Sequence, residues 1–284
     1  MEIFKEISPL KAFLKEIRKA GKTIGLVPTM GALHKGHLSL IGASKGANDV
    51  TVSTVFVNPT QFNNPNDLLK YPRTLDKDTE LLKEVRCDVL FAPETKELYP
   101  IESTLKLDFG PLDRVMEGEF RPGHFSGVGL VVSKLFNIVQ PDNAYFGQKD
   151  WQQFAVISKL VQELNFPVTL HSVATLRESD GLALSSRNLR LSENQRKVAT
   201  VFYRALQLAQ KELQNGTALN IVRKKVKEVV EHEEGVKLEY FEIADSKNLN
   251  VLENVDKANQ PILCIAGLVG EVRLIDNLFL FSNS

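Results

Sequence analysis

Residues 23–59 read TIGLVPTMGALHKGHLSLIGASKGANDVTVSTVFVNP, and this stretch decides the fold. Thr23 to Pro28 is a short apolar run that predicts a strand, and Val50 to Val57 is a second run, rich in β-branched residues. Between them, the residues from Gly36 to about Gly46 predict a helix. A strand, a helix and another strand in this order are typical of a parallel sheet covered by helices.

Predicted strands and helices also alternate before and after this stretch. A helix is expected to open at Ser8-Pro9, where serine can cap and proline suits the first helical position, and to end at Gly21. Asn58 to Asp67 is dense in Asn and Pro and predicts a loop. The remaining predicted elements are helices near 75–85, 125–139 and 150–164 and strands at 88–92, 144–146 and 168–174. With right-handed crossovers, these elements predict an α/β, Rossmann-like domain.

The pattern changes after about Leu176. Ser192-Glu193-Asn194-Gln195 fits a capping box, and a long helix is predicted from there to about Asn215. The elements predicted next are a charged helix over 218–234 and strands over 237–243, 262–268 and 272–275, with a hairpin signal at 269–271. We therefore expect residues 1–176 to form the Rossmann-like domain and residues 177–284 to form a smaller α+β domain.

Composition narrows the function classes. The chain has 284 residues, of which 43% are hydrophobic and 25% charged, so disordered and disulfide-scaffold classes are excluded. The formal net charge is zero, which gives no indication of a nucleic-acid partner or a membrane surface. Cys87 and Cys264 lie in apolar runs and are expected to be buried free thiols. With no signal peptide and no apolar run of about 20 residues, a cytoplasmic location is expected.

The segment from Pro28 to His37 connects the first predicted strand to a helix. Gly31 and Gly36 allow the backbone to approach a ligand closely, and the N–H groups of a helix N-terminus suit phosphate. His34 and His37 are three residues apart and lie on one face of the opening turn. Two imidazoles there can donate hydrogen bonds to phosphate oxygens. The alternative is a pair of capping or metal-binding histidines, although no third ligand has useful spacing.

Two further segments follow strands, where ligands of open α/β sheets bind. Gln61, in NPTQF, can offer both a donor and an acceptor to a hydroxy acid, or it is a plain loop glutamine. In FGQKDWQQ, Gly147 permits backbone contact, Lys149 can neutralise phosphate and Asp150 can accept from ribose hydroxyls. Gln153 is one turn further on. The alternative reading makes Asp150 a helix cap and Lys149 a solvated charge.

Two loop segments complete the set of candidates. Leu184-Ser185-Ser186-Arg187-Asn188 places two hydroxyls and an arginine near the join between the domains, where they could clamp phosphates. A polar linker is the alternative. Arg121-Pro122-Gly123-His124-Phe125 precedes a helix and is either a site segment or ordinary helix-start chemistry.

Together and in this order, the segments resemble those of the pantothenate synthetase family. PTMGALHKGH is similar to that family's form of the HIGH signature, which the wider nucleotidyltransferase superfamily shares. NPTQF, YPRTLDKD, RPGHFSGV, FGQKDWQQ and LSSRN each resemble family motifs. The matching segments run from about Pro28 to Asn188, and the C-terminal third is similar to the family's small domain in size and pattern.

The resemblance implies a ligase that condenses pantoate and β-alanine to pantothenate, using ATP and Mg²⁺ and forming an acyl-adenylate. It also implies a cytoplasmic homodimer, a catalytic domain over residues 1–176 and a lid over 177–284. The implied catalytic residues are His37, as proton donor, His34 and Lys149. The implied ATP-binding residues are Met30, Gly31, His34, Gly36, His37, Gly147, Gln148, Lys149, Asp150, Leu176, Leu184, Ser185, Ser186 and Arg187. The implied pantoate-binding residues are Met30, Gln61 and Gln153. Gln61 is also the implied β-alanine-binding residue, and Asp78 is the implied metal ligand. Lys77 departs from the pattern, because some relatives carry a second acid there.

Two other functions fit parts of the pattern. An adenylyltransferase of the same superfamily would release pyrophosphate but keep the nucleotide on its product. A non-catalytic nucleotide-binding module would use the same pocket for sensing, although sensing needs no arginine-serine clamp at a hinge. The two glutamines suit a small hydroxy acid better than a phosphorylated acceptor.

Overall fold

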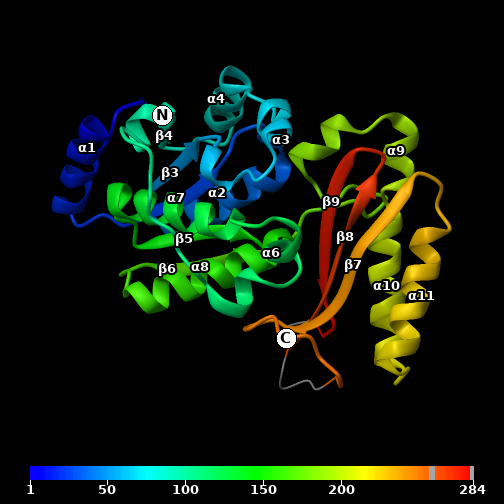
Figure 1. Ribbon diagram of the computed structural model, residues 1–284. Helices are drawn as coiled ribbons and strands as arrows, with labels where there is room; N and C mark the ends of the chain where they lie inside the picture. Colours follow the sequence, from blue (N-terminus) through cyan, green and yellow to red (C-terminus); the bar gives the residue numbers. More distant parts are fainter. Residues whose placement is uncertain (256–259, 282–284) are drawn as a thin grey trace.

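The computed structural model describes residues 1–255 and 260–281. It contains a six-stranded parallel sheet and a three-stranded antiparallel sheet, which confirms the predicted α/β architecture with a smaller α+β part (Figure 1). The division at residue 176 stays a prediction; it falls between the last strand of the larger sheet and the first helical turn before the smaller one. No helix in the described ranges is both long and apolar enough to cross a bilayer.

The larger sheet has the strand order β1-β4-β3-β2-β5-β6. Its strands are β1 (Glu2–Phe4), β2 (Ile24–Thr29), β3 (Val50–Val55), β4 (Val89–Phe91), β5 (Asn143–Gly147) and β6 (Thr169–Val173). The chain builds outward from β2 through β3 to β4 and then crosses back to place β5 on the other side of β2. The strand order therefore reverses between β2 and β5, where ligand crevices of open α/β sheets lie.

Helices cover both faces of this sheet (Figure 1). They are α1 (Ile7–Lys19), α2 (Lys35–Ala47), η1 (Pro59–Gln61), α3 (Pro65–Lys70), α4 (Leu75–Glu84), α5 (Thr95–Leu98), η2 (Gly110–Asp113), α6 (Glu117–Phe120), α7 (His124–Val139), η3 (Gln148–Asp150) and α8 (Trp151–Leu164). Helix α7 is buried along most of its length and forms the centre of the main core.

Three local predictions need correction. Helix α1 begins at Ile7, with Glu6 as the N-cap, because the carboxylate of Glu97 accepts the Ile7 N–H at 2.7 Å and replaces a serine cap. Strand β1 was not predicted. Helix α3 lies within the predicted loop, where the Asn64 side chain caps it and proline occupies its first turn.

The smaller sheet consists of β7 (Val236–Asp245), β8 (Pro261–Val269) and β9 (Val272–Phe279). The predicted hairpin between β8 and β9 is confirmed by their antiparallel register from Val269↔Val272 onward. The helical elements that precede this sheet are η4 (Ser186–Arg190), α9 (Glu193–Val198), α10 (Val201–Gln214) and α11 (Leu219–Glu231). The capping box at Ser192 and Gln195 is present, and α10 and α11 lie along one side of the sheet (Figure 1).

The two sheets share buried surface. Ala244, Leu249, Ile262 and Cys264 of the smaller sheet and its connections belong to the same hydrophobic cluster as α7 and the parallel strands. The Trp151 indole N–H donates to the Ser246 carbonyl at 2.7 Å. The Rossmann-like core is therefore completed by the last third of the chain.

Candidate active site

A cavity of about 240 Å³ lies at the carboxyl ends of β2 and β5. The segments after these two strands form neighbouring walls, because the strands are hydrogen-bonded neighbours in the sheet. The sequence-predicted residues that line the cavity are Met30, His34, Gly36, His37, Gln61, Arg121, His124, Phe125, Gly147, Lys149, Asp150, Gln153, Leu176, Leu184, Ser185, Ser186 and Arg187. Gly31, Gln148 and Asp78 are not among the lining residues.

Gly31 and Asp78 instead shape the turn that follows β2. Gly31 has a φ of +81°, and a Cβ there would lie 2.9 Å from Asp78 Oδ2. The buried Asp78 carboxylate accepts the backbone N–H groups of Ala32 at 3.0 Å and Leu33 at 2.7 Å, and the Thr74 hydroxyl at 3.2 Å. This geometry favours a structural role for Asp78 over the expected metal ligand, and no group of three or more His, Cys, Asp or Glu residues in the described ranges could hold a metal.

Replacing Asp78 by asparagine separates these two roles. The amide has one acceptor oxygen, so one of the two backbone N–H groups would face an NH₂ group in a buried site. We expect the free energy of unfolding to fall by about 1–3 kcal/mol, measured by urea denaturation. The Mg²⁺ concentration for half-maximal turnover should stay that of the wild type. A tenfold change in that concentration with unchanged stability would show instead that Asp78 binds the metal.

The two histidines occupy the first turn of α2. The His37 Nδ1 atom accepts the backbone N–H of His34 at 3.4 Å, so the proton of a neutral His37 ring is on Nε2. The ring centroids are 4.0 Å apart, and a Cβ on Gly36 would lie 3.0 Å from the His34 ring. His37 thus caps the helix with one nitrogen, as the alternative prediction allowed, and has a second nitrogen available to a ligand.

Both histidines are neutral at physiological pH. Burial, and then the charge of Lys149, lowers the pKa of His34 to about 4. Burial, followed by the neighbouring His34 and Lys149, lowers the pKa of His37 to about 3. Neutral imidazoles donate hydrogen bonds without carrying a charge that would repel Lys149. His37 is therefore suited to donate a hydrogen bond rather than to transfer a proton.

These histidines make stability depend on pH. His34, His37 and His124 have folded-state pKa values of about 4, 3 and 3, below the value near 6.5 of an unfolded chain. Their neutral burial therefore stabilises the fold above pH 6.5, and this contribution is lost as the pH falls from 6.5 towards 4. We expect a loss of up to about 1.4 kcal/mol per pH unit for each histidine. Urea denaturation at pH 7 and pH 5 would test this; equal unfolding free energies would contradict it.

Two adjacent glutamines of α8 have different surroundings. The Gln152 side chain is buried and bonds the backbone around α6: it donates to the Leu112 and Val115 carbonyls and accepts from the Glu117 N–H. Both glutamines line the cavity, but the Gln152 amide is already bonded to the backbone around α6. The Gln61 amide, which also lines the cavity, donates to Met30 Sδ at 2.9 Å and accepts from the Asn58 amide at 3.2 Å. The structure therefore places Met30, Gln61 and Gln153 on one cavity, as expected for an acid-binding set.

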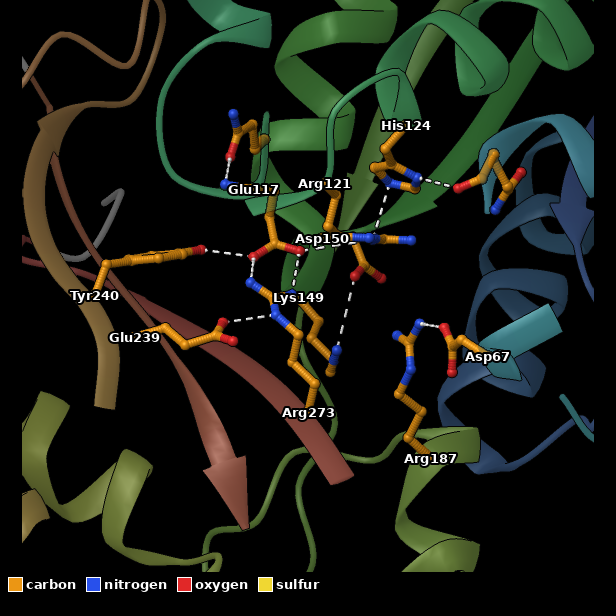
Figure 2. A network of polar contacts seen from close by, with 12 residues as sticks. Asp67, Glu117, Arg121, His124, Lys149, Asp150, Arg187, Glu239, Tyr240 and Arg273 are labelled. Carbon is orange, nitrogen blue, oxygen red and sulfur yellow. Dashed lines mark hydrogen bonds and ion pairs between the residues drawn. The ribbon is translucent and has the colours of Figure 1, made fainter. Parts of the chain in front are cut away.

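The η4 segment closes the cavity from the side of the smaller sheet. The Ser185 side chain caps η4 at the Arg187 N–H, and the Ser186 hydroxyl donates to the Ala32 carbonyl at 3.1 Å. Arg187 pairs with Asp67 of α3 at 3.0 Å (Figure 2). On the β5 side, the Lys149 ammonium lies 3.7 Å from the Asp150 carboxylate. Lys149 and Arg187 are the cations that the predicted phosphate-binding segments bring to the cavity.

Comparison with known proteins identifies the family. A family model described as pantoate–β-alanine ligase matches residues 2–279, nearly the whole chain. The chain belongs to the pantoate–β-alanine ligase family. A curated relative from Bacteroides thetaiotaomicron, named pantothenate synthetase, is 47% identical over 283 residues, with 98% of each chain covered.

Solved structures of this ligase family have the same fold. A crystal structure of pantothenate synthetase from Thermus thermophilus matches with a TM-score of 0.93 and 40% identity, and covers 99% of this chain and 100% of its own. A pantoate–β-alanine ligase from Francisella tularensis, complexed with βγ ATP and β-alanine, matches with a TM-score of 0.84 and 36% identity over 100% and 99% of the chains. The predicted family is thereby confirmed, and with it the prediction that the chain is a ligase.

A second group of polar residues in this ligase was missed by the sequence analysis. Glu117, Tyr240, Asp276 and Asn277 also line the cavity. Figure 2 shows Glu117 between Tyr240 and Arg273 of the smaller sheet and Arg121, which follows α6. The Asn277 amide donates to the carbonyls of Gln148 and Lys149 at 2.9 and 2.7 Å, and so fixes the backbone that carries Lys149. Most of these residues lie on the smaller sheet, and no local motif marks them.

Proposed function

We propose that this ligase condenses pantoate with β-alanine to form pantothenate, through a pantoyl-adenylate, with release of AMP and pyrophosphate. The observation that carries the proposal is one cavity that joins phosphate-directed donors to amide side chains suited to a hydroxy acid. His34, His37, Lys149 and Arg187 are the donors, and Gln61 and Gln153 supply the amides. The relative from Francisella tularensis, which is complexed with βγ ATP and β-alanine, supports both ligand assignments.

In the first step, a carboxylate oxygen of pantoate attacks the α-phosphorus of ATP. The new P–O bond forms as the bond to the β-phosphate oxygen breaks, and the electron pair leaves with pyrophosphate. Negative charge grows on the phosphate oxygens, where the Nε2–H of His37 and the Lys149 ammonium stabilise it. Because these donors are fixed before the reaction, little reorganisation is needed.

In the second step, the neutral amine of β-alanine attacks the acyl carbon of the adenylate. The C–N bond forms, the C–O bond to AMP breaks, and the amine loses a proton. The protein need not supply a covalent nucleophile for either step; positioning the reactants is its main task. Cys264 lines the cavity, but burial, followed by the charge of Glu117, raises the pKa of its thiol to about 12. The thiol is therefore protonated and a poor nucleophile.

One assay tests this proposal. Purified protein is incubated with ATP, Mg²⁺ and pantoate, and pyrophosphate and AMP are followed with and without β-alanine. We expect sustained turnover that requires pantoate and β-alanine and yields AMP. Pyrophosphate without AMP, with the nucleotide retained on the product, would identify an adenylyltransferase. ATP binding with no pantoate-dependent turnover would identify a nucleotide-binding module.

Three further assignments rest on family resemblance. Mg²⁺ is expected to accompany ATP, and the Asp78 carboxylate, which accepts two backbone N–H groups, is not expected to hold it. A homodimer and a cytoplasmic location also stay predictions. Analytical ultracentrifugation of the purified protein would test the dimer.

A further inference from the structure

An ion-pair cluster joins the smaller sheet to α6. Arg273 of β9 donates from both terminal nitrogens to the Glu117 carboxylate, each at 2.7 Å, and its Nε donates to Glu239 of β7 at 2.7 Å. The Tyr240 hydroxyl donates to the same Glu117 carboxylate at 2.9 Å. The Glu117 side chain is only 6% exposed. A bidentate pair in so buried a position fixes both side chains in one geometry (Figure 2).

From Glu117 the contacts continue along the wall of the cavity. Arg121 lies one turn further on, with its Nη1 atom 3.6 Å from Glu117 and 3.0 Å from His124 Nε2. The His124 Nδ1 atom lies 2.8 Å from the backbone carbonyl of Gln61. The contacts therefore lead from the smaller sheet to Gln61, which bonds Met30. Met30, Gln61 and Gln153 line the proposed acid-binding part of the cavity.

The partners of His124 determine its tautomer. A guanidinium can only donate, so Nε2 accepts from Arg121; a carbonyl can only accept, so Nδ1 carries the proton and donates to Gln61. Only a neutral ring satisfies both contacts. Burial, and then the charge of Arg121, lowers the pKa of His124 to about 3, which keeps the ring neutral.

Arg273 and Arg121 contact the same carboxylate, that of Glu117. Burial acts to raise the pKa of Glu117, but the hydrogen bonds and charge of Arg273 outweigh it and hold that pKa at about 2. Arg121 Nη1 is shared between two partners: it lies 3.0 Å from His124 Nε2 but 3.6 Å from Glu117. The Glu117 carboxylate is already bonded at 2.7 Å by both terminal nitrogens of Arg273. Without Arg273, the buried Glu117 carboxylate would keep Arg121 as its nearest cation, and we expect it to draw that guanidinium closer and away from His124.

We propose that Arg273 and Glu117 are positioning residues for Gln61, and that they act through Arg121 and His124 to couple the smaller sheet to the acid- and amine-binding part of the cavity. This inference rests on the proposed function, because it assigns Gln61 to pantoate and β-alanine. It adds that Arg273 of the smaller sheet sets the geometry for the acid and the amine, whereas the backbone of Lys149 at the nucleotide contacts is held separately, by Asn277.

Arg273→Gln tests the coupling. We expect the KM values for pantoate and β-alanine to rise about tenfold or more, because a misplacement near 1 Å can cost up to about 100-fold. The KM for ATP should stay within about twofold of the wild-type value. Arg204→Gln is the control: Arg204 also lies in the smaller domain and forms an ion pair with a glutamate, Glu233, but this pair is not one of the contacts that lead to Gln61.

The double variant Glu117→Gln with Arg273→Gln tests whether the ion pair between these residues positions Gln61 or only stabilises the fold. It removes the ion pair completely, but it also removes the charge that would attract Arg121. We expect the KM values for pantoate and β-alanine to return to within about threefold of the wild type, with the Arg121–His124 contact restored. If the inter-sheet ion pair mattered only for stability, the double variant would be as impaired as the single one.

The outcomes are distinct. Equal increases in all three KM values, no change in any of them, or no rescue in the double variant would each overturn the coupling. The ¹⁵N shifts of the His124 ring supply a readout besides turnover: the Nδ1–H tautomer should dominate in the wild type and in the double variant, but not in Arg273→Gln. If the wild type itself shows no pantoate-dependent turnover, the proposed function fails, whereas the ring shifts still report whether the contacts are coupled.

Discussion

Replacing His37 by alanine is expected to lower kcat by about 100- to 1000-fold, because one preorganised donor to the transition state is lost. The His37 Nδ1 atom is occupied by the backbone of His34, so the Nε2–H is the donor that faces the cavity. Steady-state turnover with saturating ATP, pantoate and β-alanine measures the effect. The KM for ATP should change much less than kcat, since the donor acts chiefly as charge builds on phosphorus.

His37→Gln is the matched control for this result. The amide nitrogen of glutamine reaches to about the position of Nε2 and can donate there, so we expect it to keep more of the rate than alanine does. Circular dichroism and thermal unfolding should show both variants folded. Near-normal turnover of His37→Ala would remove this residue from the chemistry and leave Lys149 and Arg187 as the main phosphate-directed groups.

Gly127→Ala is expected to have the second large effect, on both stability and activity. A Cβ on Gly127 would lie 2.1 Å from the Thr60 carbonyl oxygen and 2.7 Å from the Gln61 nitrogen, which are backbone atoms that cannot rotate away. Helix α7 would have to move from η1. We expect a loss of about 3 kcal/mol in the free energy of unfolding. We also expect a fall of about 100-fold in kcat/KM for pantoate, because Gln61 moves with η1.

Gly42→Ala is the control, because the same substitution is expected to raise the free energy of unfolding at this position. Gly42 is exposed on α2, and a Cβ there meets no atom within 4 Å. Alanine should therefore stabilise the protein by about 0.5–1 kcal/mol through helix propensity alone. Because propensity favours alanine at both positions, the difference between the two variants isolates the contact with η1. If Gly127→Ala were as stable as Gly42→Ala, α7 would not pack on this backbone.

Long runs with a clear period could be predicted from the sequence. Val50–Val55 is β-branched and buried, and α7 is apolar along its length, so both elements were located to within about two residues. Strand β1 was missed because three residues at the edge of a sheet carry no period. Helix α3 was missed because asparagine and proline mark both loops and helix starts.

Some residues of the site could be predicted from the sequence and others could not. The segments after β2 and β5 were predicted because the carboxyl ends of parallel strands meet at one edge, so local motifs determine what lies there. The contacts of Glu117 could not be predicted, because its partners Tyr240 and Arg273 are 123 and 156 positions away. Asp78 was expected at a metal because its sequence neighbours resemble a motif, but its surroundings depend on how the turn at Ala32 and Leu33 folds back onto α4.

The hydrophobic cluster shared by the two sheets has a consequence for synthesis of the protein. Cys264 and Ile262 fill the core beside α7, so the parallel sheet leaves the ribosome with part of its core uncovered. That surface stays exposed until β8 emerges, after every strand of the parallel sheet, and exposed apolar surface promotes aggregation. Nascent chains that end before residue 261 should therefore depend on chaperones, and a chain that includes β8 should unfold its two sheets in a single cooperative transition.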